Sequence, residues 1–531
     1  MQMKNKGALD LKKIITYAFL GLVVIEIGCL IYYNFVTNYV VDQDSAKLMY
    51  HTIKMWENKS LIIPNWTYAT TGEWDCSSIL AMPIYGMTGN IIFSFAIANT
   101  LNIVIFSAIV WILMKSVNIP NRYIFLALAI ILIPYSWGML DYTNMLFYSG
   151  AQYIYKVLIP LALLALFHYI PKKKHVFLYV ILFLFTESLV FLTISSSSIF
   201  VFVCGIIPVF ACRILYIFVK KELPSKKEII LFVSTMIVVA SAYVMHTMCG
   251  VASNADGMAL RNLEGMSGAF SENNLNLLKI MRVLPYDRVL VLSVQGAVSL
   301  LKCILFAFIL IFAVPNLNKF LCLDKLIRTK TAKVETISDT TLLKSELISI
   351  FICNYLVTLL TSSTSRYLLI GFIPLIVVAV IQYSSYDTAE IVNVLLIGVL
   401  LLLNLFIQRE ACNAVRTVYI NNYNRETCDK ILDAAKEQKA DLIVLYDASE
   451  WAEMIRVYDS DYPTVTYYSI NDNIWNFDYI NNIEASDIQG LNSILVVPAE
   501  RENELLDQVI DQYKYVYWED IDNMSIYKKI F

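Results

Sequence analysis

Long apolar runs recur along this chain of 531 residues and constrain its fold more than any other feature of the sequence. Each run is about 18–25 residues long, which is the length of helix that crosses the hydrocarbon core of a bilayer. About eleven such runs are predicted to span a membrane, at residues 14–33, 90–113, 122–139, 153–170, 176–194, 199–219, 228–248, 291–314, 345–362, 367–383 and 390–407.

The composition supports the same conclusion. Hydrophobic residues make up 58% of the chain and charged residues 16%, whereas soluble globular proteins have roughly 45–50% and about 25%. These proportions exclude a water-soluble enzyme, a fibrous protein and a disordered chain. The sequence therefore predicts a polytopic α-helical membrane protein with about eleven transmembrane helices.

Basic residues are distributed unevenly between the loops that join these spans. Lys and Arg cluster before the first span and in alternate loops, and they are missing from loops 141–152, 195–198 and 361–365. The positive-inside rule therefore predicts a cytoplasmic N-terminus, and an odd number of spans places the C-terminus outside. The turn at 383–390 would be cytoplasmic yet has no basic residue, and losing one span would move the C-terminus inside.

Residues 408–531 differ from the rest of the chain in charge and pattern. They contain 11 Lys and Arg against 23 Asp and Glu, a net of −12, which leaves +9 for residues 1–407. An acidic segment argues against a nucleic-acid partner. Short β-rich runs alternate with helical spacing, so we predict a small extracytoplasmic α/β domain here, after a membrane domain over 1–407. Its strands are predicted at 441–446, 493–497, 515–518 and 524–527.

Two long loops are predicted on the outer side, at 34–88 and 250–290. The first carries Asp42 and Asp44 directly after the first span, and residues 45–56 then follow the spacing of an interfacial amphipathic helix. With Ser45 as the N-cap, Asp44 lies at the positive end of the helix dipole. An ionised carboxylate at the membrane surface can serve as the general base for an incoming hydroxyl. The alternative is that both acids are solvated residues that start a helix.

The first loop resembles that of the GT-C superfamily of membrane glycosyltransferases, such as aminoarabinose transferases and protein O-mannosyltransferases. The matching pieces are Asp44, the helix at 45–56, Leu-Ile-Ile-Pro at 61–64, and Glu73. The polytopic body and the C-terminal domain are also similar, so the resemblance covers nearly the whole chain. Ser365-Arg366-Tyr367, which opens a late span containing Pro374, looks like another feature of these enzymes.

Two departures from the family pattern indicate a divergent branch. The Asp-Glu pair that is common in the family is Asp44-Ser45 here. The Lys-Pro that often follows the second acid is Trp74-Asp75, which leaves open the ligand of the donor phosphate.

The resemblance implies a transferase in a bacterial plasma membrane that uses a polyprenyl-phosphate-linked sugar donor and a cell-envelope glycan, lipid or protein as acceptor. Asp44 would deprotonate the acceptor hydroxyl, which would displace the lipid phosphate with inversion. A departing phosphate needs cationic stabilisation. The candidate cations are Arg366, Lys156, Arg261, Arg282 and Arg288, with Arg366 first and Tyr367 beside it.

Other acidic and basic residues of the first loop are candidates for substrate binding. Glu73 and Asp75 would position the acceptor or tune Asp44, because acids close together push their pKa values apart. His51 lies seven residues after Asp44 on the same helical face, with Lys47 between them. No His, Asp and Glu cluster has clear metal-ligand spacing, so we expect no required cofactor, and a divalent metal is possible but not indicated.

Two other functions remain open. A polysaccharide polymerase or ligase would carry a large outer loop late in the chain, with several Arg. A flippase or transporter would place charges near the bilayer midplane and show paired halves, and the sequence has no visible repeat. Four ionisable residues do lie in predicted spans, where they either have a function or make interhelical hydrogen bonds: Glu26, His168, Glu187 and His246.

Overall fold

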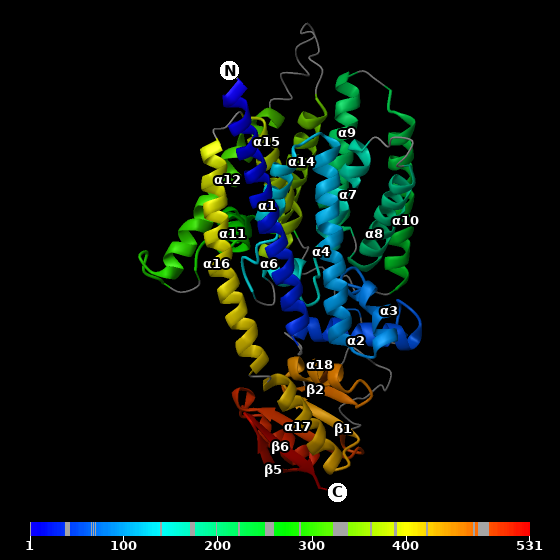
Figure 1. Ribbon diagram of the computed structural model, residues 1–531. Helices are drawn as coiled ribbons and strands as arrows, with labels where there is room; N and C mark the ends of the chain where they lie inside the picture. The colour runs from blue at the N-terminus through cyan, green and yellow to red at the C-terminus, as the bar shows by residue number, and fades with distance from the viewer. Residues whose placement is uncertain are drawn as a thin grey trace. The chain divides into compact units, whose positions relative to one another are not determined.

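The structure is a computed structural model. It describes residues 2–37, 43–64, 66, 68, 71–137, 141–169, 176–197, 199–220, 223–249, 260–285, 288–321, 338–361, 364–386, 390–420, 423–470, 473–475 and 488–530. These residues form two compact units (Figure 1). The membrane unit takes its described residues from Met1–Tyr33, Asn99–Cys249 and Ser253–Asn413, and the composite unit takes its own from Asn34–Ala98 and Ala414–Phe531.

The membrane unit is entirely helical where it is described. Its elements are α1 (Gln2–Val36), α4 (Ile91–Ser116), α5 (Asn121–Ile131), α6 (Tyr142–Leu146), α7 (Ile154–His168), α8 (Val176–Ser197), η2 (Phe202–Ile206), α9 (Ile207–Lys220), α10 (Lys226–Met248), α11 (Leu263–Ile280), α12 (Val294–Leu321), α14 (Asp339–Leu360), η4 (Ser365–Leu368), α15 (Leu369–Ser384) and α16 (Glu390–Ile420). The first residues of α4 and the ends of α1 and α16 belong to the composite unit.

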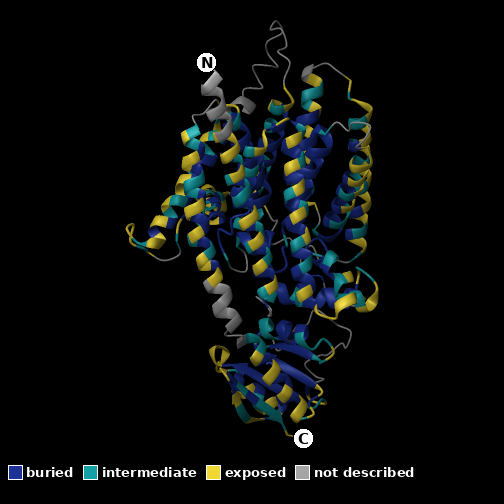
Figure 2. Cartoon of the chain, in the orientation of Figure 1, coloured by how far each residue is buried: buried dark blue, intermediate teal, exposed yellow. Residues whose placement is uncertain are grey.

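Every predicted span coincides with a helix, which confirms the polytopic helical fold. Within the described residues, eight helices are long and apolar enough to cross a membrane. The spans predicted at 122–139, 153–170 and 199–219 fall on the shorter helices α5, α7 and η2–α9. All side chains of α7 are buried, as Figure 2 shows, because apart from Lys156 and His168 this helix is apolar on every face and packs inside the unit.

The span predicted at 122–139 is too long, since α5 ends at Ile131. Pro134 follows, and the residue before a proline is disfavoured in a helix. The hydropathy of the sequence does not show that the helix ends at Ile131. The irregular segment between α5 and α7 is tolerated because side chains satisfy its backbone: Tyr135 and Tyr142 hydroxyls donate to the carbonyls of Ile130 and Ile131, and Lys302 Nζ donates to the Tyr135 carbonyl at 3.0 Å.

Each of the four ionisable residues in predicted spans makes a hydrogen bond to another helix. Glu26 accepts from Asn404 at 2.7 Å, Glu187 accepts from Ser234 and Thr235, and His246 contacts the Ser195 carbonyl. His168 contacts Glu346 of another helix. The prediction of interhelical hydrogen bonds is therefore confirmed for all four residues.

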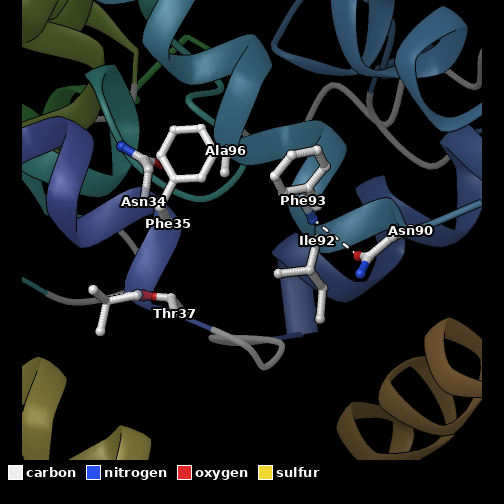
Figure 3. Close-up of a pocket in the computed structure, with 8 residues that line it drawn as sticks. Asn34, Phe35, Thr37, Asn90, Ile92, Phe93 and Ala96 are labelled. Atoms are coloured by element: carbon white, nitrogen blue, oxygen red, sulfur yellow. Dashed lines mark hydrogen bonds between the residues drawn. The ribbon is translucent and has the colours of Figure 1, made fainter. Parts of the chain in front are cut away.

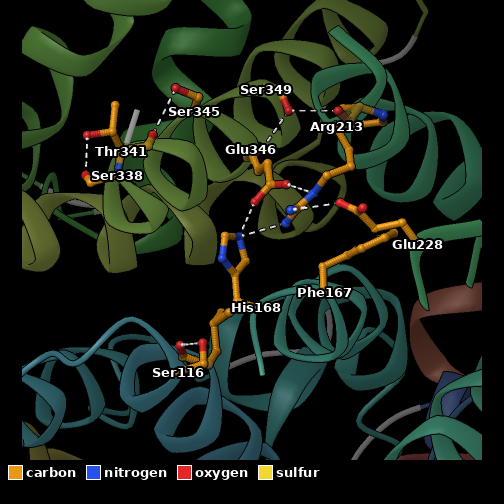
Figure 4. A network of polar contacts seen from close by, with 12 residues as sticks. Ser116, Phe167, His168, Arg213, Glu228, Ser338, Thr341, Ser345, Glu346 and Ser349 are labelled. Carbon is orange, nitrogen blue, oxygen red and sulfur yellow. Dashed lines mark hydrogen bonds and ion pairs between the residues drawn. The ribbon is translucent and has the colours of Figure 1, made fainter. Parts of the chain in front are cut away.

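His168 belongs to a buried network of charges that the sequence did not reveal (Figure 4). Its Nε2 lies 2.5 Å from Glu346 Oε2, and Arg213 joins the same carboxylate through its Nε at 2.8 Å. Glu228 adds a second acid 3.5 Å from Arg213. Charges buried in a helical bundle must be paired in this way, since an isolated charge there is costly.

The composite unit combines the first loop with an α/β domain. Its elements are α2 (Gln43–Asn58), α3 (Ser78–Thr88), α17 (Tyr423–Glu437), β1 (Leu442–Tyr446), α18 (Ser449–Tyr458), β2 (Thr464–Tyr468), β3 (Asn473–Trp475), β4 (Ser493–Pro498), η6 (Ala499–Arg501), α20 (Leu506–Tyr513), β5 (Tyr515–Ile521) and β6 (Met524–Lys529). The four predicted strands correspond to β1, β4, β5 and β6, whereas β2, β3 and α18 were not predicted.

The strands form one sheet in the order β3-β2-β1-β4-β6-β5. β1 is parallel to β2 and to β4, with Ile443 opposite Thr464 and Ile494, and the remaining pairs are antiparallel. The buried central strands supply the core through side chains such as Val444 and Leu495. A parallel centre with an antiparallel margin agrees with the predicted α/β domain.

α2 is the helix predicted at 45–56, but its surroundings differ from the prediction. It packs against α3 and against α18 of the α/β domain, and ten of its residues are buried. It is therefore enclosed by protein rather than lying with one face in water. Ser45 is not the N-cap, because the helix already begins at Gln43 and Asp44 lies in its first turn.

Candidate functional site

The acidic residues of the first loop gather at the start of α2. Asp44 is half-buried in the first turn, and Lys47 follows one turn later. Lys47 Nζ forms an ion pair with Glu73 from the loop between α2 and α3. Asp44 and Asp75 lie within electrostatic range of the same Glu73 carboxyl. The structure thus brings Asp44, Glu73 and Asp75 together, whereas Asp42 lies outside the described residues.

Glu73 is the most constrained member of this group. It is only 4% exposed, and its backbone has a φ of 66°, a left-handed conformation that costs a residue with a Cβ about 1–2 kcal/mol. Burial raises the pKa of Glu73, and the Lys47 ammonium opposes this rise. Its Oε2 has no hydrogen-bond partner among the described residues. A strained and buried carboxyl beside a half-buried carboxylate is typical of a functional site.

His51 lies within reach of this group but does not act as a cation. Its ring is fully buried, with the rings of Trp66 and Tyr68 at centroid distances of 4.8 and 5.7 Å. Burial lowers the pKa of His51 to about 3, and the charge of Lys47 adds to this shift. The imidazole is therefore neutral at physiological pH and offers a phosphate no positive charge.

The loop that carries Glu73 is held by aromatic side chains. Trp74 is fully buried and lies against Gly72, where a Cβ would approach the indole ring to 2.4 Å. Tyr68 meets Trp74 at a centroid distance of 5.8 Å. Sequence reasoning did not single out Trp66, Tyr68 or Trp74 as supports, although the density of aromatic residues in a polar loop was a usable signal.

The predicted cations form a second group, in the membrane unit. Lys156 lies in the first turn of α7, where its Nζ donates to the Gln152 carbonyl at 3.0 Å and lies 4.9 Å from the centre of the Tyr153 ring. The Arg366 guanidinium lies 5.1 Å from the Tyr367 ring, and the rings of Tyr153 and Tyr367 are 6.2 Å apart. Two tyrosine rings in tilted contact therefore connect Lys156 with Arg366.

The arginines of the second long loop are placed differently from the prediction. Residues 263–280 of that loop form α11, which packs against α14 and η4 through buried residues such as Asn273, whose amide donates to the Tyr355 carbonyl at 3.0 Å. Arg261 forms an ion pair with Glu272 at 2.8 Å. Much of the predicted loop is thus a docked helix, while residues 250–259 lie outside the described residues.

A cavity of about 480 Å³ lies in the composite unit, where α1 ends and α4 begins (Figure 3). Its lining combines polar and apolar groups: Asn34, Phe35, Val36, Thr37, Asn90, Ile92, Phe93 and Ala96. Phe35 and Phe93 meet edge to face at 5.7 Å, and both are substantially exposed. Such a lining suits an amphiphile at the membrane surface. Asp44 is not one of the residues that line the cavity.

Comparisons with known proteins bear on the fold. Among solved structures, the chain is similar to ArnT from Cupriavidus metallidurans, whose crystal structure contains bound undecaprenyl phosphate. The two superpose with a TM-score of 0.59 over 96% of this chain and 98% of ArnT, at 7% sequence identity. This chain has the GT-C fold.

The GT-C fold was expected from the first loop and is confirmed by this superposition. No protein-family model matches the chain, and no curated protein sequence matches it. A GT-C fold shared at 7% identity establishes the backbone arrangement, so the roles of individual side chains depend on their own geometry.

Proposed function

We propose that this protein is a membrane glycosyltransferase that moves a sugar from a polyprenyl-phosphate-linked donor to a cell-envelope acceptor. The observation that carries the proposal is the group of Asp44, Lys47 and Glu73 directly after the first span of a chain with the GT-C fold. The undecaprenyl phosphate in the ArnT crystal supports the choice of a lipid phosphate as the leaving group.

Asp44 is the proposed general base. It removes the proton of the acceptor hydroxyl, whose oxygen attacks the anomeric carbon of the donor sugar from the face opposite the phosphate. The new glycosidic bond forms as the bond between the anomeric carbon and the phosphate oxygen breaks, so the configuration inverts. The bonding electrons leave with the polyprenyl phosphate, and Asp44 later releases its proton to water.

The remaining residues have supporting roles in this proposal. Lys156 and Arg366 stabilise the charge that develops on the departing phosphate, and Tyr153 and Tyr367 hold the two cations. Glu73 and Asp75 orient the acceptor, with Lys47 fixing Glu73. The donor carries its own leaving group, and the proposed reaction includes no required cofactor. We place this chemistry on the outer face of a bacterial plasma membrane, with the N-terminus cytoplasmic.

The test is Asp44→Asn in membrane vesicles supplied with radiolabelled polyprenyl-phosphate sugars. Loss of a general base lowers turnover by about 10²–10⁴-fold, so we expect transfer to fall by that factor. Asp461→Asn is the control, because Asp461 is an exposed acid of the α/β domain. Undiminished transfer by a correctly inserted Asp44→Asn protein would overturn the assignment of the base.

A further inference from the structure

Helix α18 of the α/β domain packs against α2, the helix that carries Asp44, and two of the contacts between them, both within the composite unit, bear on the site. The first is at the start of each helix, where Gln43 Nε2 donates to Ser449 Oγ at 2.9 Å. Gln43 is the first residue of α2 and Ser449 is the first residue of α18. Asp44 is the next residue after Gln43, so α18 contacts a side chain of the same helical turn that carries the proposed base.

The second contact is in the middle of α2 and centres on Arg456 of α18. Its guanidinium lies 5.4 Å from the centre of the Tyr50 ring. Arg456 is 3% exposed, pairs with the equally buried Glu453 at 3.5 Å, and donates to the Thr464 carbonyl at the start of β2. A desolvated cation over an aromatic face is attracted more strongly than one in water, so this contact is stronger than a surface one.

A continuous row of packed aromatic rings connects Tyr50 with the acidic group. Tyr50 meets Trp66 at a centroid distance of 5.6 Å, and Trp66 meets His51 at 4.8 Å. His51 meets Tyr68, which in turn meets Trp74, the residue directly after Glu73. Packed rings of this kind have few alternative arrangements, so a displacement at one end shifts the other.

We propose that the α/β domain is part of the transferase site and that Arg456 is its principal positioning residue. Arg456 holds Tyr50, and through it α2 and the ring row, so that Asp44 and Glu73 keep their separation. Ser449 fixes the first turn of α2 at Gln43. The inference rests on the proposed function for its catalytic consequence, but its structural consequence can be measured independently of any reaction.

The catalytic test compares Arg456→Gln and Tyr50→Leu with Tyr50→Phe. A misplacement of about 1 Å costs up to roughly 10²-fold in rate, so we expect the first two variants to lower kcat by about 10- to 100-fold with little change in the KM for the donor. Tyr50→Phe keeps the ring and should retain nearly full kcat. The double variant Arg456→Gln/Tyr50→Leu should be faster than the product of the two single losses predicts, because the two substitutions share one contact.

Arg425→Gln is the matched control, since Arg425 lies 5.5 Å from the Tyr458 ring in the same domain and at a more exposed position. It should leave kcat unchanged. Full kcat in Arg456→Gln, or equal losses in Arg456→Gln and Arg425→Gln, would overturn the proposal.

A structural readout separates this inference from the proposed function. Hydrogen exchange of residues 43–58 in the full-length protein should rise in Arg456→Gln and stay unchanged in Arg425→Gln, whether or not the protein transfers a sugar. If α2 exchanges as in the wild type, the positioning role is wrong even if transfer is observed. If exchange rises while the wild type transfers no sugar from any polyprenyl-phosphate donor, the positioning role holds and the proposed function fails.

Discussion

Lys47 and Glu73 form an ion pair that ties the first helix of the composite unit to the loop that follows it. The carboxylate is 4% exposed, and the ammonium is its partner from one turn beyond Asp44. The pair therefore sets the distance between the two segments that contribute acids to the candidate site.

Replacing Lys47 should destabilise the protein strongly. Removing one member of a buried pair leaves the other charge uncompensated and typically costs about 3–5 kcal/mol. We expect Lys47→Met to lower the melting temperature strongly and Lys47→Arg to restore most of it, as measured by thermal unfolding in detergent. Lys59→Met is the control, because Lys59 lies over Trp56 beyond the end of α2. Equal melting temperatures for Lys47→Met and wild type would contradict the role of the pair.

Glu73 should make the stability of the protein decrease as the pH rises. Its folded-state pKa is raised above the ordinary value of 4.5, mainly by burial, so the folded protein binds the proton more tightly than the unfolded chain. The unfavourable effect of ionisation is absent below pH 4.5 and grows until the pH passes the raised pKa. Glu73→Gln should flatten this part of the profile when melting temperature is measured against pH. A profile identical to the wild type would exclude Glu73 as its source.

His51 should make the stability of the protein decrease as the pH falls. Its pKa is lowered from 6.5 to about 3, mainly by burial, so between these pH values the unfolded chain binds a proton and the folded protein does not. Stability should therefore fall as the pH drops from 6.5 toward 3. His51→Phe removes this contribution, and tryptophan fluorescence should show its unfolding midpoint shifted to lower pH. A midpoint that stays at the wild-type pH would indicate that His51 is not responsible.

Both cations of the membrane unit should be required for full transfer. Arg366→Gln and Lys156→Gln should each lower single-turnover transfer by about 10²–10³-fold if they stabilise the leaving phosphate. Arg366→Lys should recover only part of the rate, because Lys does not reproduce a planar group lying on Tyr367. Arg261→Gln is the control, since Arg261 pairs with Glu272. Rates within a factor of two of the wild type would remove both residues from the mechanism.

Gly72 should be intolerant of any side chain. A Cβ at this position would lie 2.4–2.7 Å from three atoms of the buried Trp74 indole, so the ring or the loop would have to move. We expect Gly72→Ala to reduce both melting temperature and transfer, and Gly268→Ala to be silent because no heavy atom lies within 4 Å of a Cβ there. Similar behaviour of the two variants would show that the Trp74 contact is not restrictive.

The acidic group was only partly accessible to sequence reasoning. Asp44 and Glu73 could be picked out because each has a fixed place relative to the first span and to a local helix. Their relation through Lys47 could not, because the loop between them folds back by aromatic contacts that no periodicity encodes. The same applies to Lys156 and Arg366, which are far apart in sequence and meet through Tyr153 and Tyr367.

What the sequence by itself determined is the set of properties that depend on near neighbours along the chain. Apolar length fixed the membrane spans, and residue spacing fixed α2 and four of the six strands. Only the tertiary structure decided that His168 meets Glu346 and that α18 packs against α2. The reason is physical, because Gln43 and Ser449 are 406 residues apart and their hydrogen bond forms only after α2 and α18 have packed together. Nothing local in either helix requires this bond.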